Sequence, residues 1–162
     1  MKEVALGEAT LNTDQIDHGK RSVLEARLKK LGFELLDDSR SKLIERIKVV
    51  IIDKIHHSGT LDMKYNWSDL LSDELKHDYN YVSNLFSSVE GVTIEQYIIR
   101  QKIEKAKELL FYNEKTLSEI AYFLGYSSVQ HLSTQFKKVT GQTPSEFKNS
   151  RLNSRRSLDS VQ

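Results

Sequence analysis

Hydrophobic positions recur at helical spacing through most of the chain and predict a mainly α-helical protein. The widest apolar stripe lies in residues 39–57 and predicts an amphipathic helix. Further apolar periods are bounded by N-cap residues and glycines. They predict helices over 66–75, 79–90, 93–111, 116–124, 127–140 and 143–149. A single proline and seven glycines in 162 residues argue against a β-sandwich or barrel.

The first 38 residues have a different pattern. Residues 4–11 alternate as in a strand, 15–31 have helical spacing that Gly32 ends, and 33–36 read as a second strand. We therefore expect a small β-α-β piece over 1–38, too small to hold a core by itself. Since an exposed strand edge invites pairing, homodimerisation through residues 1–38 is a further hypothesis. The Ser-, Arg- and Asn-rich residues 150–162 predict a flexible basic tail.

A unit of the helical part occurs twice, at a constant offset of 50 residues. Each copy predicts a short helix, a tight turn, a second helix, a glycine and a capped third helix. The matched pairs are Val82/Leu132, Ser83/Ser133, Phe86/Phe136, Val89/Val139, Gly91/Gly141, Thr93/Thr143 and Tyr97/Phe147. Two short helices joined by a tight turn form a helix-turn-helix. The sequence thus predicts two helix-turn-helix subdomains connected by one long helix.

The second helix of each copy has a polar outward face. In the first copy this face carries Asn80, Ser83, Asn84 and Ser87, and in the second it carries Ser128, Gln130, His131, Thr134, Gln135, Lys137 and Lys138. Asn and Gln amides can hydrogen-bond an adenine edge through two contacts. Any surface helix shows such residues, so the duplication is the stronger indication of DNA binding.

Residues 118–128 and 131–144 resemble the AraC/XylS family of bacterial transcription regulators. The resemblance lies in Ile120-Ala121, Gly125-Tyr126, Phe136-Lys137-Lys138 and Gly141-Gln142-Thr143-Pro144, and residues 103–110 resemble the family's linker helix. It extends over 39–149, which it implies is a double helix-turn-helix DNA-binding domain.

The resemblance also implies which helices read DNA. Recognition helices over about 79–89 and 128–139 would enter adjacent major-groove segments, about one helical turn apart. The implied contacts are Tyr79, Asn80, Ser83 and Asn84 in the first helix, and Ser128, Val129, Gln130, His131 and Thr134 in the second. Neither helix offers an arginine for guanine, which departs from the family's more basic members. Residues 4–37 resemble half of a heavy-metal-associated ferredoxin-like domain.

Charge is unevenly distributed although the whole chain carries only +1. Residues 66–92 contain one basic and five acidic side chains, whereas 116–162 contain six basic and three acidic ones. Phosphate neutralisation supplies most non-specific DNA affinity. We therefore expect the second helix-turn-helix and the tail to supply most of the affinity. The acidic first copy is expected to face a protein such as RNA polymerase.

Other classes find less support. The chain has no cysteine and no catalytic motif, so we expect no enzymatic activity, no cofactor and no metal site. We interpret His56-His57 as a surface pair near a helix end. No apolar run reaches membrane-spanning length, which favours a cytoplasmic protein without a membrane partner. A protein-interaction module of the same fold stays as the alternative, because 66–149 carries nine basic and eleven acidic residues. A metal-responsive regulator would need a longer form of the protein.

Overall fold

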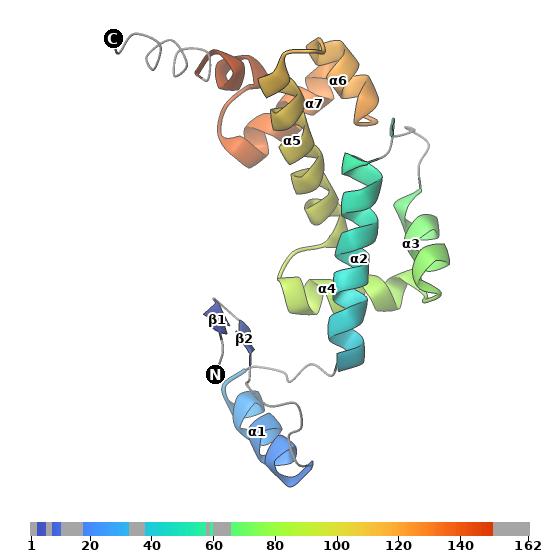
Figure 1. Cartoon of the computed structure of the whole chain (residues 1–162), viewed down its shortest axis with the longest axis vertical. Helices are drawn as coiled ribbons and strands as arrows, with labels where there is room; N and C mark the ends of the chain where they lie inside the picture. The colour runs from blue at the N-terminus through green and yellow to red at the C-terminus, as the bar shows by residue number, and fades with distance from the viewer. Residues whose placement is uncertain are drawn as a thin grey trace. The chain divides into compact units, whose positions relative to one another are not determined.

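The computed structural model describes residues 3–5, 8–10, 18–32, 38–57, 59 and 66–150 (Figure 1). The chain divides into two compact units, Met1–Asp38 and Ser39–Gln162.

The first unit contains an antiparallel hairpin followed by a helix. Strand β1 (Glu3–Ala5) pairs with β2 (Glu8–Thr10), with Glu3 opposite Thr10, and α1 spans His18–Lys30. The single strand predicted over 4–11 is therefore wrong. Gly7 interrupts the alternation there, and glycine favours a turn over a continuous strand. The helix predicted over 15–31 is present as α1, while the strand predicted over 33–36 lies outside the described residues. The resemblance to a heavy-metal-associated domain finds no support in this hairpin.

The second unit consists of helices throughout its described part, as the apolar periods predict. They are α2 (Asp38–His56), α3 (Trp67–Leu75), α4 (Tyr79–Glu90), α5 (Ile94–Tyr112), α6 (Leu117–Phe123), α7 (Val129–Thr140) and a last helical segment over 144–150. Helices α3 and α4 pack together as the first helix-turn-helix, and α6 and α7 as the second. Helix α5 packs against α4, α6 and α7 and runs from one pair to the other (Figure 1). The predicted pair of helix-turn-helix subdomains joined by a linker helix is confirmed.

One apolar core connects both subdomains. It contains Phe86, Ile103 and Phe136, each with 0% exposed surface, so the first subdomain, the linker helix and the second subdomain share a single cluster. Helix α2 contributes the stripe that its spacing predicted: Leu43, Ile44, Ile47, Ile51 and Ile55. Burial of each such side chain stabilises the fold by roughly 1.5–3 kcal/mol.

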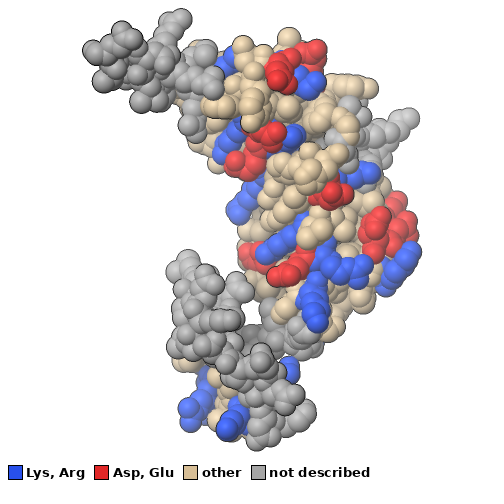
Figure 2. Space-filling view, viewed as in Figure 1, with Lys and Arg blue, Asp and Glu red and all other residues tan. Residues whose placement is uncertain are grey.

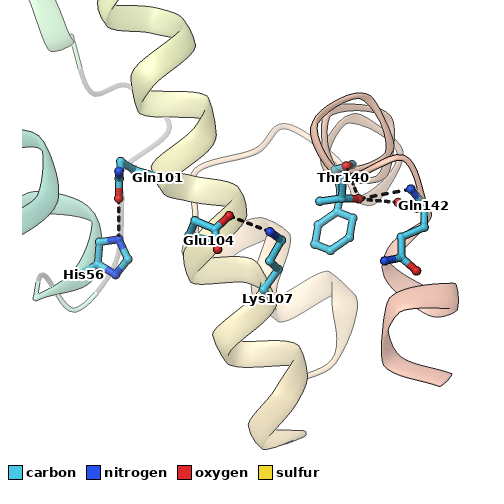
Figure 3. Close-up of polar contacts among 7 residues, drawn as sticks. His56, Gln101, Glu104, Lys107, Thr140 and Gln142 are labelled. Carbon is cyan, nitrogen blue, oxygen red and sulfur yellow. Dashed lines mark hydrogen bonds and ion pairs between the residues drawn. The ribbon is translucent and has the colours of Figure 1, made fainter. Parts of the chain in front are cut away.

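Polar contacts attach α2 to the helices beside it. Lys48 forms an ion pair with Glu90 of α4 at 2.8 Å, and Arg46 donates to the carbonyl oxygen of Glu74. At the other end of α2, His56 Nε2 lies 3.2 Å from Gln101 Oε1 of α5 (Figure 3). The interpretation of His56 as a surface residue is therefore wrong, since the half-buried ring connects two helices. His57 is exposed and contacts Asp53 of its own helix.

The sequence repeat is also a repeat of geometry. Helices α4 and α7 have 12 residues each and begin 50 residues apart, at Tyr79 and Val129. Phe86 meets the edge of Tyr97 at 5.4 Å and 66°, and Phe136 meets Phe147 at 5.6 Å and 68°. The equivalent core contacts are thus reproduced down to the ring orientation.

Cap residues set the helix boundaries. Thr93 with Gln96, Thr116 with Glu119 and Thr143 with Glu146 form reciprocal capping boxes, as predicted. The capping box predicted at Ser127–Gln130 is wrong, because the N-cap is Ser128, whose hydroxyl accepts from the His131 N–H. Helix α4 begins at Tyr79, as predicted, and Asp78 is its N-cap.

Candidate nucleic-acid interface

Helix α4 presents two unpaired amides on the face opposite its core residues. Val82, Leu85 and Phe86 are buried, whereas Asn80 and Asn84 are exposed one helical turn apart. Neither side-chain amide has a hydrogen-bond partner among the described residues. Both amides are therefore available to a ligand that lies against this face.

The other two predicted residues of α4 bind each other. Tyr79 is half-buried against the core and its phenol hydrogen-bonds Ser83. Burial raises the pKa of Tyr79, the Glu95 carboxylate raises it further, and the bond to Ser83 opposes both. This pair holds the start of α4 in place, so its hydroxyls are less free than the amides of Asn80 and Asn84.

In α7, several predicted residues have structural roles. The Ser128 hydroxyl caps the helix, Val129 packs against the core, and Thr134 Oγ1 donates to the Gln130 carbonyl oxygen at 2.9 Å. The His131 ring lies 3.1 Å from Ser127 Oγ and meets the Tyr126 ring edge-on at 5.2 Å. These contacts fix the first turn of α7 and leave the Thr134 methyl group and the second His131 nitrogen for a ligand.

Three predicted residues of α7 are exposed without a side-chain partner among the described residues. They are Gln130 at the second position of the helix and Lys137 and Lys138 in its last turn. Lys137 also lowers the pKa of Glu146, although the backbone and hydroxyl bonds from Thr143 contribute more. The second helix-turn-helix thus combines a free amide with two cations on its outer surface.

A cavity that the sequence did not predict adjoins both helices. It has a volume of about 400 Å³ and is lined by α3, α4, α5 and α7 and by the turn before α7. Tyr79 and His131, both predicted contacts, line it together with Lys102 of the linker helix. The sequence held one signal for it, since Lys102 is a cation between Ile99 and Ile103, on the apolar face of a linker helix.

The first helix-turn-helix has an acidic surface. Asp69, Asp73 and Glu74 are exposed on α3, and Figure 2 shows acidic side chains gathered over that helix. Among the described residues of α3 and α4 there is no basic side chain. The two helix-turn-helix subdomains therefore differ in charge, as the sequence indicates.

A helix-turn-helix domain family matches residues 71–150. An HTH-type transcriptional regulator from the cgkA 5′ region of Pseudoalteromonas carrageenovora is 30% identical over 117 residues, which cover 69% of each protein. The probable transcriptional regulator LumQ of Photobacterium leiognathi is 30% identical over 106 residues, 65% of this chain and 42% of LumQ. The fold matches the DNA-binding domain of AdpA, solved with a target DNA, at a TM-score of 0.59. That match has 17% identity and covers 70% of this chain and 96% of that one.

The chain belongs to the AraC/XylS family, and residues 71–150 form an AraC-type helix-turn-helix DNA-binding domain. The family and the class of DNA-binding transcription regulators that the sequence predicted are confirmed. The chain spans less than half the length of LumQ. In the described residues, no helix has both the length and the apolar composition that crossing a membrane requires.

Proposed function

We propose that this chain binds double-stranded DNA sequence-specifically by placing α4 and α7 in adjacent major-groove segments. The observation that carries the proposal is the equivalence of Asn80 and Gln130. They are 50 residues apart, each is the second residue of its helix, and each presents an exposed amide without a partner among the described residues. Recognition helices read base edges with their N-terminal residues, and both amides suit adenine.

The neighbouring residues receive secondary roles in this proposal. Asn84 and Thr134 are also equivalent in the repeat, lie one turn further on, and would contact the next base. Lys137 and Lys138 would bind phosphates beside the second groove. Four residues would position the helices and contact the DNA backbone: Tyr79, Ser83, Ser128 and His131. Val129 would pack against the core or a thymine methyl group.

Selection of bound duplexes from a random DNA pool tests the proposal. We expect an enriched motif with two half-sites about one helical turn apart (~10 bp). The double variant Asn80→Ala/Asn84→Ala should relax the sequence preference in one half-site only. Gln130→Ala/Thr134→Ala should relax it in the other. Asn149→Ala is the matched control, because it removes an exposed amide that lies outside both helices.

The competing function is a protein-interaction module that retains the fold. The acidic surface of α3 favours a protein partner for the first helix-turn-helix, and RNA polymerase is the partner that a transcription regulator would meet there. Absence of enrichment, together with binding lost at moderate salt, would replace the DNA proposal with this one. Pull-down of purified polymerase with wild type and with Asp69→Asn/Asp73→Asn distinguishes a polymerase contact from DNA binding.

Residues 1–38 would supply dimerisation, and the whole protein would act in the cytoplasm without enzymatic activity. Among the described residues, the β1–β2 hairpin has two strand edges that could pair with a second copy. Sedimentation at high protein concentration checks this, since a monomer would remove the dimer from the proposal.

A further inference from the structure

The cavity between the two helix-turn-helix subdomains contains a cation without a counter-ion. Lys102 of α5 is half-buried there, and no carboxylate pairs with it among the described residues. By contrast, Lys105 and Lys107 of the same helix pair with Glu108 and Glu104 at 2.8 and 2.7 Å. Figure 3 shows the second of these pairs. A desolvated ammonium group without a counter-ion costs stability, and burial accordingly lowers the pKa of Lys102.

A buried tyrosine lies beside Lys102. Tyr126 has 6% of its surface exposed, and its hydroxyl oxygen is shielded from solvent and has no hydrogen-bond partner among the described residues. Burial raises the pKa of Tyr126 to about 12, so this hydroxyl keeps its proton at neutral pH. Lys102 Nζ lies 5.3 Å from the centroid of the Tyr126 ring. At this distance the ammonium group lies over the ring in a cation–π contact, so Tyr126 partly compensates the charge that no carboxylate balances.

Glu95 is the acid that lines this cavity. It does not form an ion pair with Lys102 among the described residues, and its charge acts on Tyr79 instead, whose pKa it raises. The remaining walls near Lys102 include Ile98, Ile99 and Trp67. Apolar walls lower the local dielectric constant and strengthen the attraction between Lys102 and an anion that enters.

We infer that this cavity binds an oxyanion, a phosphate or carboxylate group, with Lys102 as its counter-charge. The cavity adjoins α4 and α7 through Tyr79, His131 and Gln135. An oxyanion bound there would contact both subdomains and the linker helix at once. It would therefore stabilise one relative orientation of the two recognition helices.

The oxyanion can come from two sources. One is a backbone phosphate of the DNA strand that crosses between the two major-groove segments, and this source rests on the proposed function. The other is a free small molecule that carries a phosphate or carboxylate group, which does not depend on DNA binding. Both sources present the anionic oxygens that Lys102 would bind.

Titration of the full chain with inorganic phosphate at constant ionic strength tests the cavity without DNA. Trp67 is the only tryptophan and lines the cavity, so its fluorescence reports on occupancy. We expect a saturable change that Lys102→Met weakens about tenfold or more, because hydrogen bonds to charged groups are the strong ones. The control Lys107→Met removes the same charge from the same helix outside the cavity and should leave phosphate binding unchanged. Tyr126→Phe removes only the buried hydroxyl, keeps a ring beside Lys102, and is a second control that should leave phosphate binding unchanged.

Titration with the selected duplex at several salt concentrations identifies the source. If DNA supplies the oxyanion, Lys102→Met lowers the salt slope by about 0.9 and weakens binding equally for all sequences. If a free molecule supplies it, phosphate still binds and the slope stays unchanged. Phosphate binding without DNA binding would support the cavity and overturn the proposed function. DNA binding with neither a phosphate response nor a slope change would overturn the oxyanion site alone.

Discussion

The two helix-turn-helix subdomains share a skeleton and differ on their surface. At equivalent positions the core keeps Phe86 and Phe136, each fully buried and each beside a second aromatic ring. On the outer face, by contrast, Ser87 and Ser88 of α4 correspond to Lys137 and Lys138 of α7. Packing therefore restricts the residue types at the buried positions of the repeat. The exposed positions lack this restriction, so the two copies can carry different charges there.

The division of labour proposed here follows from that freedom. The first subdomain carries amides, which suit sequence reading. It also carries acids, which suit a protein contact but repel phosphates. The second carries an amide together with two lysines, which suit reading and phosphate neutralisation. One fold used twice can therefore separate recognition from affinity.

The largest effect is expected from truncation of the two equivalent phenylalanines. Phe86→Ala and Phe136→Ala should each lower the free energy of unfolding by about 3–5 kcal/mol, because each leaves a cavity in the core. Since both side chains belong to one apolar cluster, urea unfolding should remain a single transition by circular dichroism and by Trp67 fluorescence. If circular dichroism and Trp67 fluorescence gave different urea midpoints in either variant, the subdomains would unfold independently.

The next effect concerns DNA affinity. Lys137→Gln/Lys138→Gln should lower the salt slope of binding by about 2 and weaken binding about tenfold, because two phosphate contacts are lost. Ser87→Lys/Ser88→Lys places the same charges at the equivalent positions of α4 and should raise the slope by a similar amount. Fluorescence anisotropy at four salt concentrations measures both. An unchanged slope in the α4 variant would show that the two helices do not face DNA in the same way.

A smaller effect on the free energy of unfolding is expected at the two tight turns, which place different residues in the left-handed conformation. Lys76 adopts a left-handed φ of +56° in the first turn, whereas the second turn has Gly125 at +69°. A side chain in this conformation costs roughly 1–2 kcal/mol. Lys76→Gly should therefore raise the free energy of unfolding by about 1 kcal/mol, and Gly125→Ala should lower it by about as much. Thermal unfolding measures both, and a loss of stability in Lys76→Gly would contradict the assigned strain.

The smallest effect is a pH dependence confined to the second subdomain. The N–H and hydroxyl groups of Thr143 hold the pKa of Glu146 below its usual range, and Thr116 does the same for Glu119. Because the folded pKa is lowered, this stabilisation is present above the usual glutamate pKa (~4.3) and is lost as pH falls through the folded value.

Substitution of these carboxyl groups tests that assignment. Glu119→Gln and Glu146→Gln should each flatten the fall in stability with acid. The first subdomain has Gln96 at the position equivalent to Glu146, so Gln96→Glu should steepen that fall. Urea midpoints between pH 3 and 6 measure the effect, and identical acid profiles in all three variants would contradict it.

The sequence contained most of the fold because local signals agree with the packing. Thr93, Thr116 and Thr143 mark helix starts by chemistry that acts within four residues, and the apolar period of α2 predicted its buried stripe. The 50-residue offset even predicted the Phe86–Tyr97 and Phe136–Phe147 equivalence. The hairpin β1–β2 was missed, because a short alternating segment does not reveal where the chain reverses.

The candidate site was predictable only in outline. Helical spacing predicted that Asn80, Asn84 and Gln130 lie on outer faces, and all three are exposed in the structure. Their contact with DNA stays a prediction. Spacing did not reveal that Ser128 is used as a cap or that Tyr79 is bonded to Ser83. The cavity around Lys102 and Tyr126 depends on contacts between residues far apart in the chain, which no local pattern contains.

Helix α5 also sets the rotational phase between the two recognition helices. Its 19 residues span roughly 28 Å as one rigid element to which α4 and α7 are both packed. One inserted residue would turn the second subdomain by about 100° relative to the first and advance it by ~1.5 Å. Under the proposed function, the length of this single helix would set the spacing of the two half-sites, and only insertions close to whole helical turns would keep both helices facing the same side of the DNA.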